Sequence, residues 1–377
     1  MAENFYARHA ATLRGLERKN RLRSLAPRAG LDFASNDYLG LAGSKRLSNA
    51  VAKAIARGTP VGAAGSRLLR GNAPEHEELE VFAASFFGSE CALYFGGGYI
   101  ANFAVLTTLP QKGDLLVLDA LAHASMHEGA EAGRAHYVLA AHNDVNAFDD
   151  AIKKWRNGSG LGRVWIAVES LYSMDGDCAP LADLVHLADR HDAFIYVDEA
   201  HATGVHGLGG RGFTAAFEGR ENILALHTCG KALGASGALV SAPKVLCDYL
   251  VNRARPFIYA TAPSPLMAVA VLESLKIVRD EPERRERLKQ LINFASHRTQ
   301  IKPSGSQIIP VVIGDNGRTM ALASALQARG FDVRGIRPPT VPEGTARLRI
   351  SITLNVDEAA ISSMLEALVE EMGKPTP

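Results

Sequence analysis

The chain has 377 residues, of which 47% are hydrophobic and 21% charged, a balance typical of a folded globular protein rather than a disordered or collagen-like one. This length suggests one large domain with one or two smaller attachments. Because 41 Lys and Arg residues oppose 40 Asp and Glu residues, the charge balance points to neither a nucleic acid nor an acidic membrane surface as the partner.

The cysteines and the N-terminal residues bear on the compartment. The four cysteines are widely spaced and form no C-x-x-C pair, which indicates reduced thiols and excludes a zinc ribbon. Residues 1–23 are polar and charged, and no run of 18 apolar residues occurs. We therefore expect no signal peptide, no membrane-spanning helix and a cytoplasmic protein.

The first predicted element is an amphipathic helix between Arg8 and Leu25, where apolar residues recur with helical spacing. This helix could pack on a partner subunit. The segment Leu31–Leu41, LDFASNDYLGL, then forms a turn between apolar stretches, and the main domain begins near it. The predicted limits are an N-terminal helix and arm at 1–38, a large α/β domain at 39–273 and a small α+β domain at 274–377.

The middle of the chain alternates apolar, β-rich runs with stretches of helix length. The runs are LLVLD at 115–119, VWIAVES at 164–170, FIYVDEAH at 194–201, NILALHT at 222–228 and GALVSA at 237–242. Continuous apolar strands separated in this way predict a parallel sheet covered by helices on both faces. Ligand sites in such sheets lie at the strand ends.

The tail contains a charged helix through DEPERRERLKQL, a strand at QIIPVVIG, a helix before Gly330, a strand at RLRISITL and a final helix. In the last strand, alternation places apolar residues on one face and Arg347, Arg349, Ser351 and Thr353 on the other. We expect the first face to be core and the second to be free to meet a ligand.

The strongest chemical pattern combines Asp198, at the end of FIYVDEAH, with Lys231 in the glycine-rich segment CGKALG. Pyridoxal phosphate requires such a pair: an amine that forms a Schiff base, and a carboxylate that keeps the pyridine nitrogen protonated. Each residue alone is more often a loop lysine or a helix-capping aspartate. Their combination with the following features favours the cofactor site.

The segment FGGGYIAN, at 95–102, leads from an apolar strand into a helix. Free backbone N–H groups at a helix start bind anions and could hold the cofactor phosphate, with the hydroxyl of Thr228 as a further contact. A tight turn is the plainer alternative. His123 follows the strand LLVLD and could stack on the pyridine ring; it could also be an ordinary strand-end residue, or a metal ligand with His127, although no third ligand is evident.

His201 and Ser173 each follow a predicted strand and could hydrogen-bond the phenolic oxygen of the cofactor, although isolated polar residues are more often caps or turn formers. A strand that ends in DEAH also occurs in some helicases and other nucleoside triphosphatases. That alternative requires a phosphate loop, and here Ala225 and Ala232 replace its first glycine and its hydroxyl residue. The sequence therefore excludes it.

Five motifs resemble the α-oxoamine synthases, and the resemblance covers nearly the whole chain: SNDYLGL at 35–41, GSRLLRGN at 65–72, HEELE at 76–80, DEAHATGVHGLGGRG at 198–212 and the GKALG segment. It implies a fold-type I, aspartate aminotransferase-like architecture with a large mixed, mainly parallel sheet and a smaller C-terminal α+β domain. It also implies a homodimer in which both subunits contribute to each active site.

The resemblance assigns Lys231 to the Schiff base, Asp198 to the pyridine nitrogen and His123 to ring stacking. Further cofactor contacts are implied for Ser173, His201, Thr228, Gly98 and Tyr99, and for Thr261 toward the neighbouring subunit's phosphate. Substrate contacts are implied for Arg349 with the amino acid carboxylate, for Asn36 nearby, and for Thr340 and Arg23 near the acyl group. The chain departs from the family where Cys229 and Gly230 replace the usual Phe and Ser before the lysine.

Within the family, the length, the block at 65–80 and RPPTVPEGTARLRIS at 337–351 are most similar to the biotin-pathway member. This implies decarboxylative condensation of L-alanine with a pimeloyl thioester, carried by coenzyme A or acyl carrier protein. Ser66, where glycine-using relatives typically have threonine, suggests room for the methyl group of alanine. The alternatives are 5-aminolevulinate synthase, 2-amino-3-ketobutyrate CoA ligase or serine palmitoyltransferase activity, or an inactive ligand-binding protein.

Overall fold

The computed structural model describes residues 5–298 and 304–374 and divides into two compact units. The small unit comprises Met1–Ser35, Met174–Gly176 and Arg287–Pro377, and the large unit comprises Asn36–Ser173 and Asp177–Glu286. The units thus divide at 35/36 and 286/287, whereas the sequence predicts domain limits at 38/39 and 273/274. Residues 274–286 stay with the large unit because helix α10 (Pro265–Asp280) packs on its helices α2 and α3.

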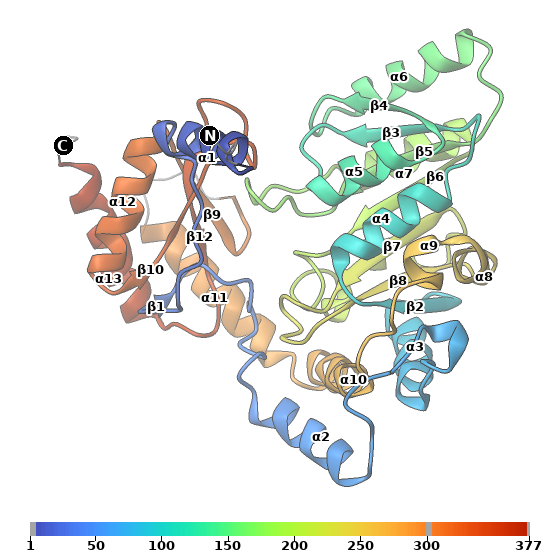
Figure 1. Cartoon of the computed structure of the whole chain (residues 1–377), viewed down its shortest axis with the longest axis horizontal. Helices are drawn as coiled ribbons and strands as arrows, with labels where there is room; N and C mark the ends of the chain where they lie inside the picture. Colours follow the sequence, from blue (N-terminus) through green and yellow to red (C-terminus); the bar gives the residue numbers. More distant parts are fainter. Residues whose placement is uncertain (1–4, 299–303, 375–377) are drawn as a thin grey trace. The chain divides into compact units, whose positions relative to one another are not determined.

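The large unit is built on a seven-stranded sheet with the strand order β2-β8-β7-β6-β5-β3-β4 (Figure 1). Strands β3 to β7 run parallel to one another, and β8 is antiparallel to both of its neighbours. The strands are β2 (Cys91–Phe95), β3 (Leu115–Asp119), β4 (His136–Ala140), β5 (Val164–Glu169), β6 (Ala193–Asp198), β7 (Ile223–Thr228) and β8 (Ala238–Ala242). The predicted strands at 115–119, 164–170, 194–201, 222–228 and 237–242 are confirmed, and the sheet is mixed and mainly parallel as expected.

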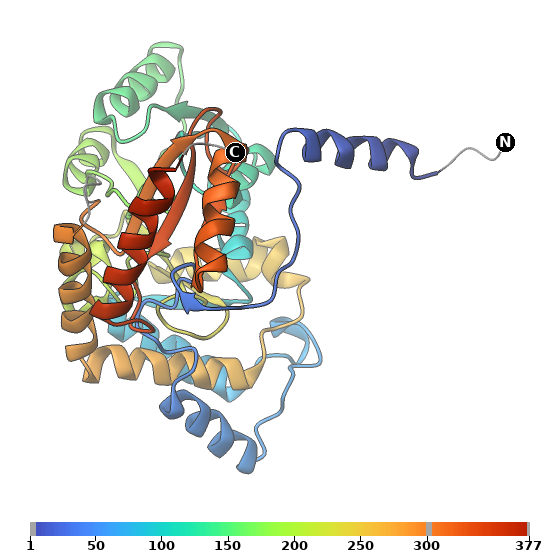
Figure 2. The ribbon, with the colours of Figure 1, turned by 90° about the vertical axis from the view of Figure 1, so that its left-hand side faces the viewer.

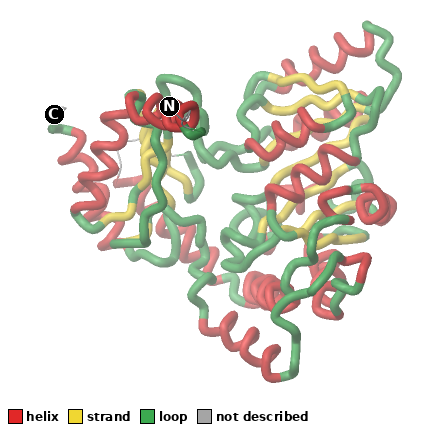
Figure 3. The backbone as a smooth tube through the Cα atoms, viewed as in Figure 1, coloured by secondary structure: helices red, strands yellow, loops and turns green. Residues whose placement is uncertain are grey.

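Helices cover both faces of this sheet, and Figure 3 shows the strands between them. The first face packs on α4 (Gly98–Thr108), α5 (Ala124–Ala132), α8 (Lys244–Arg253) and α9 (Arg255–Ile258), and the second on α6 (Val145–Asn157) and α7 (Leu181–His191). The helices α2 (Lys45–Ala56) and α3 (Pro74–Phe87) complete the unit. Most apolar residues of the inner strands β3, β5, β6 and β7 therefore pack into one of two buried cores, which explains why these strands are apolar on both sides. The edge strand β4 instead leaves Tyr137 and Leu139 exposed.

The small unit contains a three-stranded antiparallel sheet in the order β11-β12-β9 and a short parallel pair, β1 with β10. Its strands are β1 (Leu31–Asp32), β9 (Ile308–Gly314), β10 (Phe331–Asp332), β11 (Arg334–Ile336) and β12 (Ala346–Ser351), and its helices are α1 (Ala7–Arg18), α12 (Asn316–Ala328) and α13 (Glu358–Met372). Helix α11 (Glu283–Arg298) begins in the large unit and continues into the small one.

Two predictions for the small unit are wrong in detail. The N-terminal helix ends at Arg18 rather than near Leu25, and it buries none of its residues; Figure 2 shows it extending away from the sheet of its unit. In β12 both faces are buried, because Arg347, Arg349 and Ser351 are covered as fully as their apolar neighbours. Within residues 5–298 and 304–374, no helix is both long and apolar enough to cross a membrane.

Candidate functional site

Three polar residues end neighbouring strands of the large sheet on the same face. Glu169 ends β5, Asp198 ends β6 and Thr228 ends β7. Along each strand, the residues two and four positions earlier pack into the core formed with α4 and α5, so strict alternation puts the three polar side chains on that face as well. The carboxyl edge of the sheet therefore presents two carboxyl groups and a hydroxyl beneath α4 and α5.

Asp198 is buried and held by two donors. Its Oδ2 accepts a hydrogen bond from Asn102 Nδ2 at 2.7 Å, and its Oδ1 accepts one from the backbone N–H of Ala200 at 2.9 Å. Asn102 is itself fixed, because its Oδ1 accepts a bond from Tyr196 Oη at 2.8 Å and its Nδ2 donates to Ser125 Oγ at 2.9 Å. The carboxylate is thus oriented by side chains from both α4 and α5.

Lys231 lies in the loop between β7 and β8 and contacts the imidazole of His201. The distance from Lys231 Nζ to His201 Nε2 is 2.7 Å, and Tyr38 Oη is 2.7 Å from the other ring nitrogen. Tyr38 Oη in turn donates to Asn36 Oδ1 at 2.9 Å. If the ammonium of Lys231 donates to Nε2 of His201, Nδ1 carries the ring proton and donates to Tyr38 Oη. Every hydrogen bond in the series from Lys231 to Asn36 then joins one donor to one acceptor.

The loop that carries Lys231 is fastened at both ends. The backbone N–H of Cys229 bonds to Gly237 O at 2.9 Å, and Tyr94 Oη bonds to Ser236 O at 2.6 Å. Cys229 is fully buried, and burial raises the pKa of its thiol. The residue that departs from the family pattern therefore fills the core beside the lysine.

The glycine-rich segment starts helix α4 beside Thr228. Gly98 is the first residue of α4, and a Cβ built on it would lie 3.2 Å from Thr228 Oγ1. A helix start next to a hydroxyl offers N–H and O–H donors to an anion. Tyr99, one position later, is partly exposed, and its hydroxyl donates to Glu128 on α5.

His123 caps the N-terminus of α5, with its Nδ1 2.7 Å from Ser125 Oγ. Desolvation lowers the pKa of this imidazole, Asp198 raises it and Lys231 lowers it. One imidazole thus feels both the carboxylate and the amine of the proposed pair, which places the two charges around the same small region. His127 instead bonds backbone carbonyls of Ala120 and Ala122.

The other expected cofactor residues of the large unit lie at two places. The backbone N–H of Ser173 bonds the carboxyl group of Glu169, so Ser173 stands at the end of β5. Thr261 is exposed after α9 and lines a pocket together with Arg67, Gly96 and Phe257.

The expected substrate residues of the small unit form two groups. Arg23 Nη2 lies 3.3 Å from Thr340 Oγ1, so the structure brings together two residues that lie far apart in the sequence. Arg349 is on β12, where it is 6% exposed and donates to Ser351 Oγ at 2.9 Å. The large unit accordingly contains the residues expected to hold the cofactor, along with Asn36, and the small unit contains those expected to hold the rest of the substrates.

Sequence reasoning missed Asn102, Tyr38 and Glu169. Asn102 stands four residues after Gly98 and hence on the same side of α4, a spacing that could have indicated it. Tyr38 lies in the SNDYLGL motif, two residues from Asn36, but nothing local shows that it contacts a histidine at position 201. Glu169 ends a predicted strand as Asp198 does, so the same strand-end argument applies to it.

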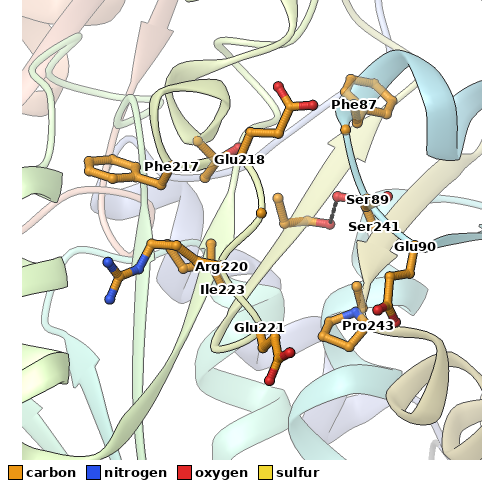
Figure 4. A pocket seen from close by; sticks show the side chains of 15 residues that line it. Phe87, Ser89, Glu90, Phe217, Glu218, Arg220, Glu221, Ile223, Ser241 and Pro243 are labelled. Carbon is orange, nitrogen blue, oxygen red and sulfur yellow. Dashed lines mark hydrogen bonds between the residues drawn. The ribbon is translucent and has the colours of Figure 1, made fainter.

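The pocket shown in close-up lies at a different place (Figure 4). It is lined by the start of β7, with Ile223 and Ala225, and by the end of the antiparallel β8, with Ser241 and Pro243 beside it. At about 3.3 Å per residue, its lining residues Ala225 and Ile223 lie about 10 Å and about 16 Å along β7 from Thr228. It lies at the opposite edge of the sheet from Lys231 and is not the candidate site.

The residues at the carboxyl edge fit pyridoxal phosphate. The amine of Lys231 and the carboxylate of Asp198, each oxygen of which accepts a hydrogen bond, supply the two groups that the cofactor needs. Gly98 leaves room beside Thr228 that a Cβ would fill. Among residues 5–298 and 304–374, no three His, Cys, Asp or Glu side chains are grouped so as to hold a metal ion.

Comparisons with known proteins agree with this architecture. Residues 28–368 match the family described as aminotransferase class I and II. The chain is 42% identical over 354 residues to 8-amino-7-oxononanoate synthase of Chromobacterium violaceum, covering 92% of this chain and 90% of that protein. It is 40% identical over 377 residues to the protein of the same name from Anaeromyxobacter dehalogenans, covering 95% and 94%.

Solved structures give the same result. Serine palmitoyltransferase from S. paucimobilis has a TM-score of 0.87 at 26% identity, covering 97% of each chain. The 8-amino-7-oxononanoate synthase of Francisella tularensis has a TM-score of 0.77 at 27% identity, covering 91% of this chain and 98% of that one. The predicted fold-type I architecture is confirmed. The chain belongs to the aminotransferase class I and II family and, within it, to the α-oxoamine synthases.

Proposed function

We propose that the chain condenses L-alanine with a pimeloyl thioester and releases carbon dioxide and the carrier thiol, giving 8-amino-7-oxononanoate for biotin biosynthesis. The observation that carries the proposal is the cluster at the carboxyl edge of the large sheet. There Lys231 contacts His201, and the charges of both Lys231 and Asp198 act on the imidazole of His123. Relatives of that name, about 40% identical over nearly the full length, support the choice of reaction.

Pyridoxal phosphate is the cofactor that this cluster is proposed to hold. When bound, it withdraws electrons from the α-carbon of an amino acid and makes the α-proton acidic. Lys231 supplies the attachment amine and then acts as the base that removes this proton. Asp198 keeps the pyridine nitrogen protonated. His123 covers the ring, His201 and Ser173 bond its phenolic oxygen, and Thr228 with the N–H groups at the start of α4 binds the phosphate.

The substrate contacts belong to the proposal as well. Arg349 binds the carboxylate of the amino acid, because a guanidinium can form two parallel hydrogen bonds to it. Arg23 and Thr340, which already contact each other, bind the acyl substrate, and Asn36 lies near the amino acid. We further propose a homodimer in which Thr261 reaches the neighbouring subunit's phosphate, and either coenzyme A or acyl carrier protein as the carrier.

The alternative substrate pair of serine and a palmitoyl thioester has one observation in its favour. The TM-score to serine palmitoyltransferase, 0.87, exceeds the 0.77 to 8-amino-7-oxononanoate synthase. The higher sequence identity of the full-length alanine-using relatives outweighs it, since shape is common to the family whereas side chains select substrates. A matrix of alanine, glycine and serine against pimeloyl, succinyl, acetyl and palmitoyl thioesters, scored by thiol release, tests the choice. Alanine with pimeloyl thioester should dominate, and dominance of any other pair would overturn it.

The role of Lys231 has its own test. Purified protein loaded with pyridoxal phosphate should be yellow, and Lys231→Ala should lose the visible absorbance band of the attached cofactor. Lys153→Ala, which removes a lysine 58% exposed on α6, should keep it. A colourless parent protein after cofactor addition, or an unchanged band in Lys231→Ala, would favour a binding protein without this chemistry.

A further inference from the structure

Glu169 forms a buried pair with Asp198. The two residues are register partners at the ends of the parallel strands β5 and β6, so their side chains leave the sheet on the same face. Glu169 is 2% exposed and Asp198 is 4% exposed. Two carboxyl groups that share a buried site cannot both keep a full negative charge without large repulsion.

The hydrogen-bond donors around the pair are distributed unequally. Each oxygen of Asp198 accepts a bond, from Asn102 Nδ2 and from the N–H of Ala200. Glu169 is bonded by the N–H of Ser173, whereas its Oε1 is buried and has no hydrogen-bond partner among the described residues. Donors stabilise a carboxylate, and an oxygen without a donor does not. A proton shared by the pair therefore resides on Glu169.

The charges that face Glu169 lead to the same assignment. Burial and the repulsion from Asp198 raise the pKa of Glu169 well above its usual value, and Asp119 at the end of β3 adds to the repulsion. Lys231, in the loop after β7, and the N–H of Ser173 act in the opposite direction. Burial is the largest of these influences, so the surroundings of Glu169 favour its neutral acid over its carboxylate.

We propose that Glu169 is a neutral carboxylic acid in the resting protein and a positioning residue of the active site. It leaves Asp198 as the one ionised carboxylate of the pair and offers its own O–H as a hydrogen-bond donor to the cofactor site. The unpaired buried Oε1 is the atom that this role uses. This inference rests on the proposed function, because the group that it serves is the proposed cofactor.

The first test needs neither cofactor nor substrate. The infrared spectrum of the cofactor-free protein at neutral pH should contain a carboxylic-acid carbonyl band that loses the contribution of Glu169 in Glu169→Gln, while any contribution of the buried Glu199 remains. Glu273→Gln is the matched control, since Glu273 forms a 2.6 Å ion pair with Arg46 and should contribute no such band. An unchanged band in Glu169→Gln would overturn the neutral acid, and would leave the Lys231 test of the proposed function untouched.

The second test compares neutral replacements. Gln has nearly the shape of a protonated Glu and keeps a donor, so Glu169→Gln should bind pyridoxal phosphate within about threefold of the parent, with an unchanged pH profile of the visible band. Glu169→Ala removes the donor and should raise the dissociation constant by roughly tenfold. If Glu169→Gln bound the cofactor as weakly as Glu169→Ala, a neutral donor would not be sufficient and the proposal would be wrong.

Discussion

Replacing Asn102 by alanine tests the buried network that holds Asp198. The change removes the 2.7 Å bond from Asn102 Nδ2 to the carboxylate and the 2.8 Å bond from the hydroxyl of Tyr196. A hydrogen bond to a charged group contributes roughly 1.5–3 kcal/mol, and leaving a buried hydroxyl without a partner costs about 1–3 kcal/mol. Helix propensity favours alanine slightly. We therefore expect the free energy of unfolding to fall by about 3–5 kcal/mol.

The assay is urea unfolding of the cofactor-free protein, followed by circular dichroism at one fixed protein concentration. Asn252→Ala, on the exposed surface of α8, is the control, and it should change the free energy by no more than about 0.5 kcal/mol because its bond to Asp248 O is exposed. A loss below about 1 kcal/mol in Asn102→Ala would refute the reasoning, since a buried carboxylate would then have lost a donor without consequence.

Three further predictions concern titration and the helix start. Burial disfavours a charged His142, but its bonds to two aspartates raise its pKa to about 10. The charged His142 should therefore stabilise the fold fully below about pH 6.5, and this contribution should disappear as the pH rises through 10. Thermal unfolding of the parent and of His142→Gln across this pH range would show the loss. Burial lowers the pKa of His227 to about 3, so the free energy of unfolding should fall as the pH drops from about 6.5 toward 3. In His227→Gln the same change in pH should lower the free energy of unfolding by a smaller amount. Gly98→Ala places a Cβ 3.2 Å from Thr228 Oγ1 and should weaken cofactor binding by roughly tenfold in a spectrophotometric titration.

The sequence was sufficient for the strand ends that carry Asp198 and Thr228. Both residues close continuous apolar runs, and such runs are buried on both faces wherever they occur in a parallel sheet. The order of the strands then brings their carboxyl ends to one edge without further information from the side chains. The pairing of Lys231 with Asp198 likewise followed from chemistry, because one cofactor requires both groups.

Contacts that depend on register or on distant segments could not be read in this way. The pairing of Glu169 with Asp198 exists only because β5 and β6 align those two positions, and a shift of one residue would separate them. The bond between Tyr38 and His201 joins segments 163 positions apart. In β12, alternation of polar and apolar residues suggested one open face, but the surrounding structure buries Arg347 and Arg349 as well. Local pattern gives the direction of a side chain, whereas its environment is set by the rest of the chain.

The register of β7 places two consecutive residues, His227 and Thr228, on opposite faces of the sheet, where each has a separate role. Thr228 faces α4 and stands beside Gly98, while His227 points to the opposite face, where it stacks on Phe87 of α3 at 3.5 Å. Its ring nitrogens lie 2.9 Å from Thr203 Oγ1 and 3.1 Å from Ser241 Oγ. Thr203 Oγ1 donates to Glu199 O at 2.9 Å, whereas the competing bond from Ser241 Oγ to Ala225 O is long, at 3.4 Å. The shorter bond favours Thr203 as the acceptor from Nδ1–H and Ser241 as the donor to Nε2. A slip of one residue in β7 would bury Thr228 against Phe87 and bring the histidine to the helix start. The stacking of His227 on Phe87 and its two hydrogen bonds therefore stabilise the register that places the hydroxyl of Thr228 at the site.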